Sequence, residues 1–547
     1  MSAFRRALAQ RNPDPAGRRW LFVPYDQLTH ELGPLARENV RELGIVLIES
    51  PRKASLRPYH QQKLALVLAN LRHFALEQAE RGVAVRHEVA AGSYAETLVA
   101  LAGELGPLRV MEPAERELRV DMQLAIDRGA MDVLPHEGWL TNREQFVGSQ
   151  PGAPYRMEAF YRAVRKHTGV LMTAGKPIGG RFSFDAENRK PWPGSPKPAE
   201  APEFTGDAIV EEVAELVRTR YARHPGQVNT AQLPATRADA ERVWEHAKRE
   251  CLPHFGPWED AMSVSERRLF HTAISPLLNL SRLTAQRVLR EAVELDIPLT
   301  SKEGFVRQLL GWREYMRHVH VETDGFRKGG AATVDRPGDG GYAAWSGQQW
   351  LERPAGTGGA SPSVLGAMNG VPPAYWGKRS GLSCLDNVIE AVWSDAYSHH
   401  ITRLMVLSNI AMLLDVSPRE LTDWFWVAYY DAYDWVVEPN VLAMGSFGAG
   451  DSITTKPYVA GAAYINRMSD YCEHCQFDPR TTCPLTPMYW AFLDRHRAAL
   501  EPIQRMRLPL LSEARRSVET RQHDRAVFEQ TRAALARGEA LPPPLRR

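Results

Sequence analysis

The chain has 547 residues, of which 44% are hydrophobic and 24% charged, the proportions of a globular protein large enough for several domains. No run of about 18 apolar residues occurs, which excludes an ordinary membrane-spanning helix. The net charge of +2 is too small for a uniformly basic nucleic-acid binder, so any such contact needs a local patch. With only five cysteines, a disulfide framework is excluded, and we expect reduced thiols in a cytoplasmic protein.

The N-terminal part predicts an α/β domain. Residues 1–19 are rich in arginine and lack the apolar core of a secretory signal, so we expect a basic surface extension. Across residues 20–150, short apolar runs alternate with helical stretches, which predicts a parallel sheet covered by helices. The apolar runs are Trp20–Val23, Gly44–Ile48, Val83–Val85, Leu108–Met111 and Met131–Leu134, and the helical stretches include Tyr59–Arg81 and Tyr94–Leu105.

Residues 151–237 are predicted to link this domain to a large all-helical domain, 238–547. Within the linker, Lys190–Gly206 is rich in proline and is expected to be a semi-rigid connector. Beyond it, apolar residues recur at helical spacing in Asp239–Cys251, Ser263–Val293, Lys302–Val321, Asn387–Leu414 and Pro418–Trp435. The Gly- and Pro-rich stretch Asp324–Gly366 interrupts this pattern, and loops of that length are usually functional or disordered.

Cys472, Cys475 and Cys483 lie close together in the segment 468–490. A C-x-x-C pair lets two sulfurs bind one centre, and the following Asp-Pro turn can return the third. Both zinc and a four-iron cluster take four such ligands, so the spacing does not choose between them. The fourth ligand could be Cys384, Cys251 or His474.

Seven aromatic residues stand between Trp424 and Trp435. A bulky core helix explains them, but tryptophans in series also let an electron hop between a buried cofactor and the surface. Asp431 and Asp434 lie among these rings, and buried carboxylates need partners.

His399, His400 and Arg403 form a cluster at helical spacing. A histidine titrates near neutrality and can donate or accept a proton at a reaction site. The alternative is a pair of hydrogen-bonded core or surface histidines.

Longer motifs resemble a known family, the photolyase–cryptochrome superfamily, and within it the prokaryotic iron–sulfur branch that repairs pyrimidine (6-4) photoproducts. The matching stretches are GRFSFDAENRKP (180–191), FVRQLLGWREYMR (305–317), DAYSHHITRLM (395–405), DAYDWVVEPNV (431–441) and TKPYVAGAAYINRMSDYCEHC (455–475). The N-terminal domain matches more loosely, through Asp26-Gln27-Leu28, Glu49 and His60.

The resemblance implies three cofactors. FAD would bind in the helical domain, and a 6,7-dimethyl-8-ribityllumazine antenna near Asp26, Glu49 and His60. A [4Fe-4S] cluster would be held by Cys384, Cys472, Cys475 and Cys483, which leaves Cys251 spare. The flavin contacts would be Ser275, Asn279, Gln308, Trp312, Arg313, Arg403, Asp431 and Asn440.

It also implies a site for UV-damaged DNA, single- or double-stranded, on a monomeric protein. His400, with His399 beside it, would pass a proton to the lesion, and Arg403 would tie this edge to the flavin. Tyr458 and Tyr464 would border the lesion. Asp185 and Arg189 would approach the damaged strand, with Asp185 as a candidate Mg²⁺ ligand.

Three features depart from the family pattern. The interval between Cys475 and Cys483 is short, so the cluster loop is expected to be pinched or differently ligated. Phe425 stands where the family has tyrosine, in an electron path with Trp424 and Trp376, which predicts slower photoreduction or a route through Trp426. Val437 replaces a glutamate near the flavin, with Glu438 next to it.

Two other functions compete with repair. One is a blue-light photoreceptor (cryptochrome) of the same fold without repair activity, which Phe425 and Val437 leave open. The other is a zinc-bearing nucleic-acid module without flavin.

Overall fold

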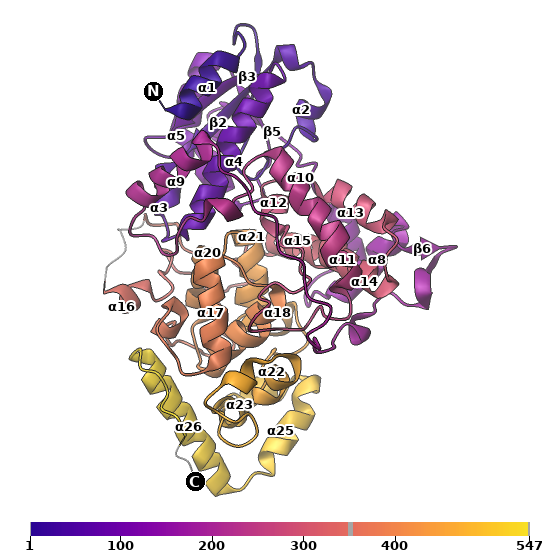
Figure 1. Ribbon diagram of the computed structural model, residues 1–547, viewed down its shortest axis with the longest axis vertical. Coiled ribbons are helices and arrows are strands. Elements are labelled where there is room, and N and C mark those ends of the chain that lie inside the picture. Colours follow the sequence, from indigo (N-terminus) through magenta and orange to yellow (C-terminus); the bar gives the residue numbers. More distant parts are fainter. Residues whose placement is uncertain (1, 348–353, 545–547) are drawn as a thin grey trace.

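The computed structural model describes residues 2–347 and 354–544. Figure 1 shows an elongated molecule with the α/β domain at one end and the helices of the C-terminal segment at the other. The helices between them carry most of the predicted site residues. Within the described residues, no helix is long and apolar enough to cross a membrane.

The predicted parallel sheet is confirmed. Five parallel strands lie in the order β3-β2-β1-β4-β5. Every residue of the interior strand β2 is buried, because parallel sheets are covered on both faces. The strands are β1 (Arg19–Phe22), β2 (Leu43–Glu49), β3 (Ala84–Val89), β4 (Leu108–Met111) and β5 (Met131–Leu134).

Helices α4 (Gln61–Glu80), α5 (Tyr94–Leu105) and α6 (Arg116–Asp127) connect these strands. Helix α5 begins with a capping box, in which Ser93 and Glu96 satisfy each other's backbone amides. Both of the helical stretches predicted in this region are thus present.

The N-terminal segment is a helix that packs on the α/β domain with one face, while Arg5, Arg6 and Arg11 are exposed. Residues Ala3–Arg11 form helix α1, which is capped by Ser2. Phe4 and Leu8 are buried, and the Phe4 ring packs edge-on against His87, with centroids 4.8 Å apart. This helix therefore belongs to the core of the α/β domain.

The segment 151–237 is more than a linker. Helix α8 (Met157–Thr168) packs into the helical part, and α9 (Ala208–Arg220) packs against α4 of the α/β domain. Between them lie the short hairpin of β6 (Met172–Thr173) and β7 (Lys176–Pro177) and the proline-rich stretch, which has no helix or strand across Lys190–Gly206. The connector prediction holds for that stretch alone.

The helical region is more broken than its apolar pattern suggested. The stretch Ser263–Val293 is not one helix, since residues 263–274 are irregular. The stretch Asn387–Leu414 is interrupted at Ala396, whose φ is +52°. The main helices are α10 (Arg237–His246), α12 (Ser275–Asn279), α13 (Ala285–Glu294), α14 (Leu299–Val306), α15 (Glu314–Thr323), α17 (Ser383–Asp395), α18 (His400–Thr402), α19 (Asn409–Leu413), α20 (Pro418–Ala428), α21 (Asp434–Val437), α22 (Ala462–Met468), α23 (Leu485–Arg495), α25 (Arg507–Ala514) and α26 (Val518–Ala536).

Wide π-type turns occupy Arg307–Arg313, Arg403–Ser408 and Glu438–Gly445. Such turns often occur at functional sites, because the extra residue re-aims side chains. Here they carry Arg313, Arg403 and Asn440.

In the described part of Asp324–Gly366, the short helix α16 (Tyr342–Ser346) lies beside Trp376, and Thr333 bridges to Ala360. Residues 348–353 of this stretch lie outside the described residues.

Candidate active site

Asp431 is the centre of the best-connected group of predicted flavin residues. Its carboxylate accepts hydrogen bonds from the Ser275 hydroxyl (2.6 Å) and from both terminal nitrogens of Arg403 (3.0 Å each). Its backbone carbonyl accepts one from the Asn279 amide (2.9 Å). Helix α20 ends at Ala428, so Asp431 lies in an irregular segment rather than on the helix that its spacing suggested.

Arg403 is a fixed cation at this site. Burial opposes its charge, but the adjacent Asp431 carboxylate outweighs that effect and raises the pKa of Arg403. Its guanidinium also lies 4.0 Å from the centre of the Tyr429 ring. A planar, permanently charged group between a carboxylate and a ring is well placed to orient a flat ligand.

The other predicted flavin residues do not join the group around Asp431. Arg313 lines a small cavity with Asn279, whereas the Gln308 amide donates to Glu259 at 2.6 Å. Trp312 borders a different groove together with Tyr458. Asn440 donates to the Val436 carbonyl within its own turn. The structure therefore brings together Ser275, Asn279, Arg403 and Asp431, with Arg313 nearby.

His399 and His400 meet a third imidazole. His271 stacks on His399 with ring centroids 4.3 Å apart and lies 5.3 Å from His400. Burial, followed by repulsion from the neighbouring imidazoles and Arg403, lowers the pKa of His271 and His399. His399 is buried, whereas the His400 side chain is 45% exposed. His400 is therefore the imidazole that can meet a substrate.

Sequence analysis missed His271, because residues 263–293 were assigned to a continuous helix. Within the described residues, His271 Nε2 and His399 Nδ1 are buried without a hydrogen-bond partner. Buried polar atoms are usually paired, so these two nitrogens fit a site that a polar ligand completes.

Asp260, also missed, joins the exposed edge of this group. It lies 3.9 Å from His400 Nε2 and accepts a hydrogen bond from the Tyr464 hydroxyl at 3.3 Å. Arg189 lies 3.7 Å from it. Burial raises the pKa of Asp260 to about 6, although Arg189 opposes the shift. Near neutral pH this carboxyl can hold or release a proton.

Behind Asp260, the Arg307 guanidinium contacts three carboxylates, those of Asp185 (3.3 Å), Glu259 (3.1 Å) and Glu303 (3.5 Å). Asp185 also pairs with Arg189. Two guanidinium groups thus contact the Asp185 carboxylate, and its role as a Mg²⁺ ligand stays a prediction.

Tyr458 lies apart from Tyr464, at a groove on the surface. This groove is lined by α8 and by the segments around Thr454 and Arg505, and four cationic side chains border it: Arg156, Arg162, Lys166 and Arg505. A local basic groove of this kind can bind phosphates despite the low net charge.

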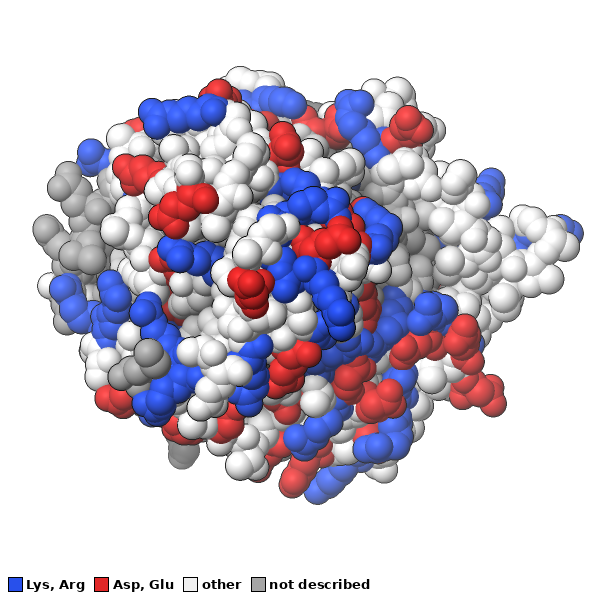
Figure 2. All heavy atoms as spheres, turned by 90° about the horizontal axis from the view of Figure 1, so that it is seen from above, with Lys and Arg blue, Asp and Glu red and all other residues white. Residues whose placement is uncertain are grey.

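The end of the molecule formed by the α/β domain has a different distribution of charge. Figure 2 shows basic and acidic side chains interspersed over this face, without a broad basic surface. The basic groove beside Tyr458 is therefore the better candidate for contact with a polyanion.

An apolar cavity between the α/β domain and the helical region contains one of the three predicted antenna residues. Glu49 lines it, together with Tyr25, Tyr59, Lys63 and Trp426. Aromatic walls with a few charged groups suit a flat heterocycle. Asp26 and His60 do not line this cavity: Asp26 accepts from the Ala114 amide, and His60 caps α4 and stacks on Trp393. Their assignment to the antenna stays a prediction.

The four predicted cluster cysteines interact with one another. Burial, followed by the nearby thiols of Cys483, Cys475 and Cys472, raises the pKa of Cys384 well above its ordinary value. Cys251 is buried elsewhere, beside a groove containing Arg268. Within the described residues, no three His, Cys, Asp or Glu side chains are arranged to bind a single metal ion.

The short loop from Cys475 to Cys483 forms a turn held by Asp478. Its carboxylate accepts from the amides of Arg480 and Thr481, and its carbonyl accepts from those of Thr482 and Cys483. This tight turn folds the chain back toward the C-x-x-C pair. The loop is therefore compact.

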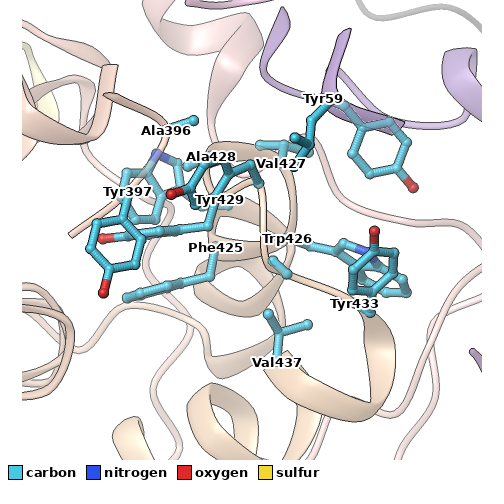
Figure 3. Packing of buried hydrophobic residues seen from close by; sticks show 14 of the residues in the cluster. Tyr59, Ala396, Tyr397, Phe425, Trp426, Val427, Ala428, Tyr429, Tyr433 and Val437 are labelled. Carbon is cyan, nitrogen blue, oxygen red and sulfur yellow. The ribbon is translucent and has the colours of Figure 1, made fainter. Parts of the chain in front are cut away.

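The aromatic residues of α20 point in opposite directions. In Figure 3, Phe425 lies with Tyr397 and Tyr429 on one side of the helix, and Trp426 lies with Tyr59 and Tyr433 on the other. The Arg57 guanidinium lies 3.7 Å from the centre of the Trp426 ring. This placement does not support an electron route from Trp424 through Trp426.

Glu438 does not replace the glutamate missing at Val437. It is fully buried in contact with His320 (2.8 Å), Arg419 (3.0 Å) and Arg327 (3.4 Å). Burial opposes its charge, but these partners lower the pKa of Glu438 to about 2. Its role is to anchor the stretch around Arg327 to the helical core.

Comparisons with known proteins point to the photolyase family. A family model described as deoxyribodipyrimidine photo-lyase-related protein matches residues 21–233. A "(6-4) photolyase" from Agrobacterium fabrum is 33% identical over 518 residues, which cover 91% of this chain and 96% of that protein. An uncharacterized protein of Acanthamoeba polyphaga mimivirus is 36% identical over 66 residues, which are 12% of this chain and 54% of that protein.

The fold is also similar to a crystal structure of a bacterial class III photolyase from Agrobacterium tumefaciens. The TM-score is 0.52 at 13% identity, and the match covers 94% of this chain and 98% of that one. At this identity the likeness concerns the fold alone.

Proposed function

The chain belongs to the deoxyribodipyrimidine photolyase-related family, and from this membership we propose that it is a (6-4) photolyase that repairs UV-damaged DNA with light. One observation carries the proposal. His400 lies 3.9 Å from the protonatable Asp260, and its neighbour His399 stacks on His271. Arg403, one turn further along the chain, is paired with Asp431. Cofactor-orienting and proton-transferring groups are thus adjacent.

Ser275, Asn279, Arg403 and Asp431 would hold FAD. The unpaired imidazole nitrogens next to them and the permanent charge of Arg403 fit a large polar cofactor. When bound, FAD supplies the light-driven electron that opens the lesion, and the protein supplies position and protons.

The proton would come through His400. An imidazole of ordinary pKa is mostly neutral at pH 7, while Asp260, with a pKa of about 6, holds a proton in a fraction of molecules. The proton would leave the Asp260 carboxyl, reach His400 Nε2, and pass to the lesion base as the electron arrives. His399 and His271 would hold the His400 ring in position.

Damaged DNA would bind across this edge. A lesion inside a duplex is out of reach, so it must be flipped out, at a cost of a few kcal/mol that is smaller for a damaged base. Tyr464 would border the flipped lesion. Arg189 and the groove of Arg156, Arg162, Lys166 and Arg505 would contact phosphates, with Tyr458 between them.

Cys384, Cys472, Cys475 and Cys483 would hold a [4Fe-4S] cluster. The thiols act on one another electrostatically, and in a [4Fe-4S] cluster each cysteine would bind its own iron. The motif resemblance, rather than the sulfur geometry, favours this cluster over a single zinc ion.

The lumazine antenna would bind in the cavity of Glu49, Tyr59, Lys63 and Trp426. Lys63 donates to the carbonyl of Trp426 at 3.0 Å. This contact joins the cavity to the segment that carries the flavin-side residues.

The test is illumination of the reduced protein with an oligonucleotide that carries one (6-4) lesion, followed by chromatography of the products. Restored thymines under light and none in the dark are expected. An oligonucleotide with a cyclobutane dimer is the control for lesion class. Lesion binding without restored thymines would instead favour a photoreceptor.

A further inference from the structure

Trp393, which sequence analysis did not single out, lies between the two predicted electron carriers. It is carried by α17, and its ring centroid is 6.1 Å from that of Trp424. On its other side it stacks on Trp376, with centroids 5.0 Å apart and an interplanar angle of 17°. The indoles of Trp424 and Trp376 are therefore joined through Trp393.

Phe425 is not in this position. Its ring contacts Trp424 at 5.1 Å and stacks on Tyr429 at 5.3 Å, on the side that faces Arg403. Among the described ring contacts, none joins Phe425 to Trp376. The residue that cannot form a neutral radical thus lies off the path between the tryptophans.

Backbone acceptors fix the three indoles. The carbonyl of Tyr375 accepts hydrogen bonds from both Trp424 Nε1 (3.2 Å) and Trp393 Nε1 (2.9 Å). The carbonyl of Gly340 accepts from Trp376 Nε1 (2.8 Å). In a low-dielectric interior, a carbonyl oxygen aimed at an indole N–H stabilises the positive charge that the ring carries after losing an electron.

The neighbours of Trp393 also suit a transient positive charge. His60 stacks on its other face, with centroids 5.8 Å apart. Burial lowers the pKa of His60 to about 4, so this imidazole is neutral at pH 7 and does not repel the charge.

Trp393 is the member of this group that reaches solvent. Trp424 is fully buried and Trp376 is 3% exposed, whereas Trp393 is half-buried and borders an open groove. Lys378 and Glu390 border the same groove. A small reductant can therefore approach the Trp393 ring directly.

The inner end of the path lies at the candidate flavin site. The Trp424 ring centroid is 6.2 Å from that of Tyr429, whose ring lies below the Arg403 guanidinium. Arg403 in turn pairs with Asp431.

We propose that Trp393 is the electron relay between Trp424 and a thiol reductant in solution, in the role that the family resemblance assigns to Phe425. The inference rests on the proposed function, because it needs a flavin at the Arg403–Asp431 site. Under light, Trp424 gives one electron to the oxidised flavin, and Trp393 gives one electron to Trp424. The positive charge is shared with the stacked Trp376 until a thiol supplies one electron and releases one proton on its way to a disulfide.

The experiment follows flavin photoreduction by absorbance in purified protein with a thiol reductant. Trp393→Phe should slow it roughly tenfold or more, a change equivalent to a barrier increase of about 1.4 kcal/mol. Trp490→Phe, a half-buried tryptophan in α23 outside this group, should photoreduce at the wild-type rate. An unchanged rate in Trp393→Phe would overturn the relay.

Trp393→Tyr is the control for misfolding, because it changes the same position but keeps an oxidisable ring. It should slow flavin photoreduction less than Trp393→Phe does. Flash photolysis provides a second readout: the tryptophan radical signal should decay faster in Trp393→Phe, because the charge returns from Trp424. Equal radical lifetimes would also reject the relay.

The two proposals fail separately. Chemically reduced Trp393→Phe should repair the (6-4) oligonucleotide as wild type does. Wild-type repair with unimpaired photoreduction in the variant would reject the relay alone. Slow photoreduction in the variant with no wild-type repair would reject the repair proposal alone.

Discussion

Arg403 and Asp431 are joined by two parallel hydrogen bonds, each 3.0 Å long, in which the two terminal nitrogens of the guanidinium match the two carboxylate oxygens. Such forked pairs fix orientation as well as charge. This pair joins the π-type turn after α18 to the segment after α20, and Ser275 adds the start of α12. Three segments of the helical region therefore depend on one carboxylate.

Asp431→Asn should lower the free energy of unfolding by about 3–5 kcal/mol, because it leaves the Arg403 cation buried without its counter-charge. Flavin should be lost on purification. Urea unfolding followed by circular dichroism, together with the flavin-to-protein absorbance ratio, measures both effects. Asp451→Asn, at an exposed position, should change neither. A stable, flavin-loaded Asp431→Asn protein would contradict this account of the site.

His400→Ala should abolish repair while FAD stays bound, because His400 is the exposed imidazole that relays the proton. Repair of a (6-4) oligonucleotide and the flavin spectrum are the measurements. His523→Ala, on the exposed face of α26, is the matched control and should repair normally. Activity in His400→Ala would exclude it as the proton donor.

Cys475→Ser should give insoluble or iron-free protein, since metal binding and folding are coupled. Iron content and the broad visible absorbance of the cluster are compared with those of Cys251→Ser. Cys251 lies outside the group of four, so its variant should retain full iron. Iron retained in Cys475→Ser, or lost in Cys251→Ser, would reassign the ligands.

Arg505→Ala should weaken DNA binding about equally for damaged and undamaged strands. Each lost phosphate contact should reduce the slope of log affinity against log salt by roughly 0.7–0.9. Fluorescence anisotropy over a salt series measures the slope, and Arg41→Ala, exposed in the α/β domain, should leave it unchanged. A slope unaffected by Arg505→Ala would move the phosphate contacts away from this groove.

Asp26→Asn should stabilise the protein at alkaline pH. Burial raises the pKa of Asp26 from 3.8 to about 6, although backbone amides oppose the shift. Since the folded pKa is the higher one, its contribution to stability is fully present below pH 4 and is lost as the pH rises through 6. A shift of this size corresponds to at most about 3 kcal/mol.

The variant should therefore exceed wild type in unfolding free energy at pH 8 and equal it near pH 4. Asn can still accept the Ala114 hydrogen bond, which the wild-type carboxylate accepts at 2.8 Å. Thermal unfolding at both pH values tests the prediction, and a gain that persists at pH 4 would contradict it.

Local patterns in the sequence were enough for several features. The runs Leu108–Met111 and Met131–Leu134 are strands with the predicted bounds, the first mostly buried and the second an edge strand with only Met131 buried. The C-x-x-C spacing identified Cys472 and Cys475 as a pair, and the prolines of 190–206 excluded helix. The family followed from longer motifs.

The sequence pattern did not determine where helices stop. Ala396 takes a left-handed φ that breaks the predicted helix before His399, and α20 ends at Ala428, so Asp431 leaves the helix. Apolar residues at helical spacing also occur in irregular but buried segments, and only packing distinguishes the two.

Only the tertiary structure decided which residues from different segments of the chain are in contact. His271 meets His399, Asp260 meets His400, and Trp393 stacks on Trp376. The first two pairs are each more than a hundred residues apart, so no periodicity or spacing could indicate them. The sequence by itself determined which residues can do chemistry, through their types and local motifs. The fold decided which of them work together, because burial, charge compensation and ring stacking depend on three-dimensional proximity.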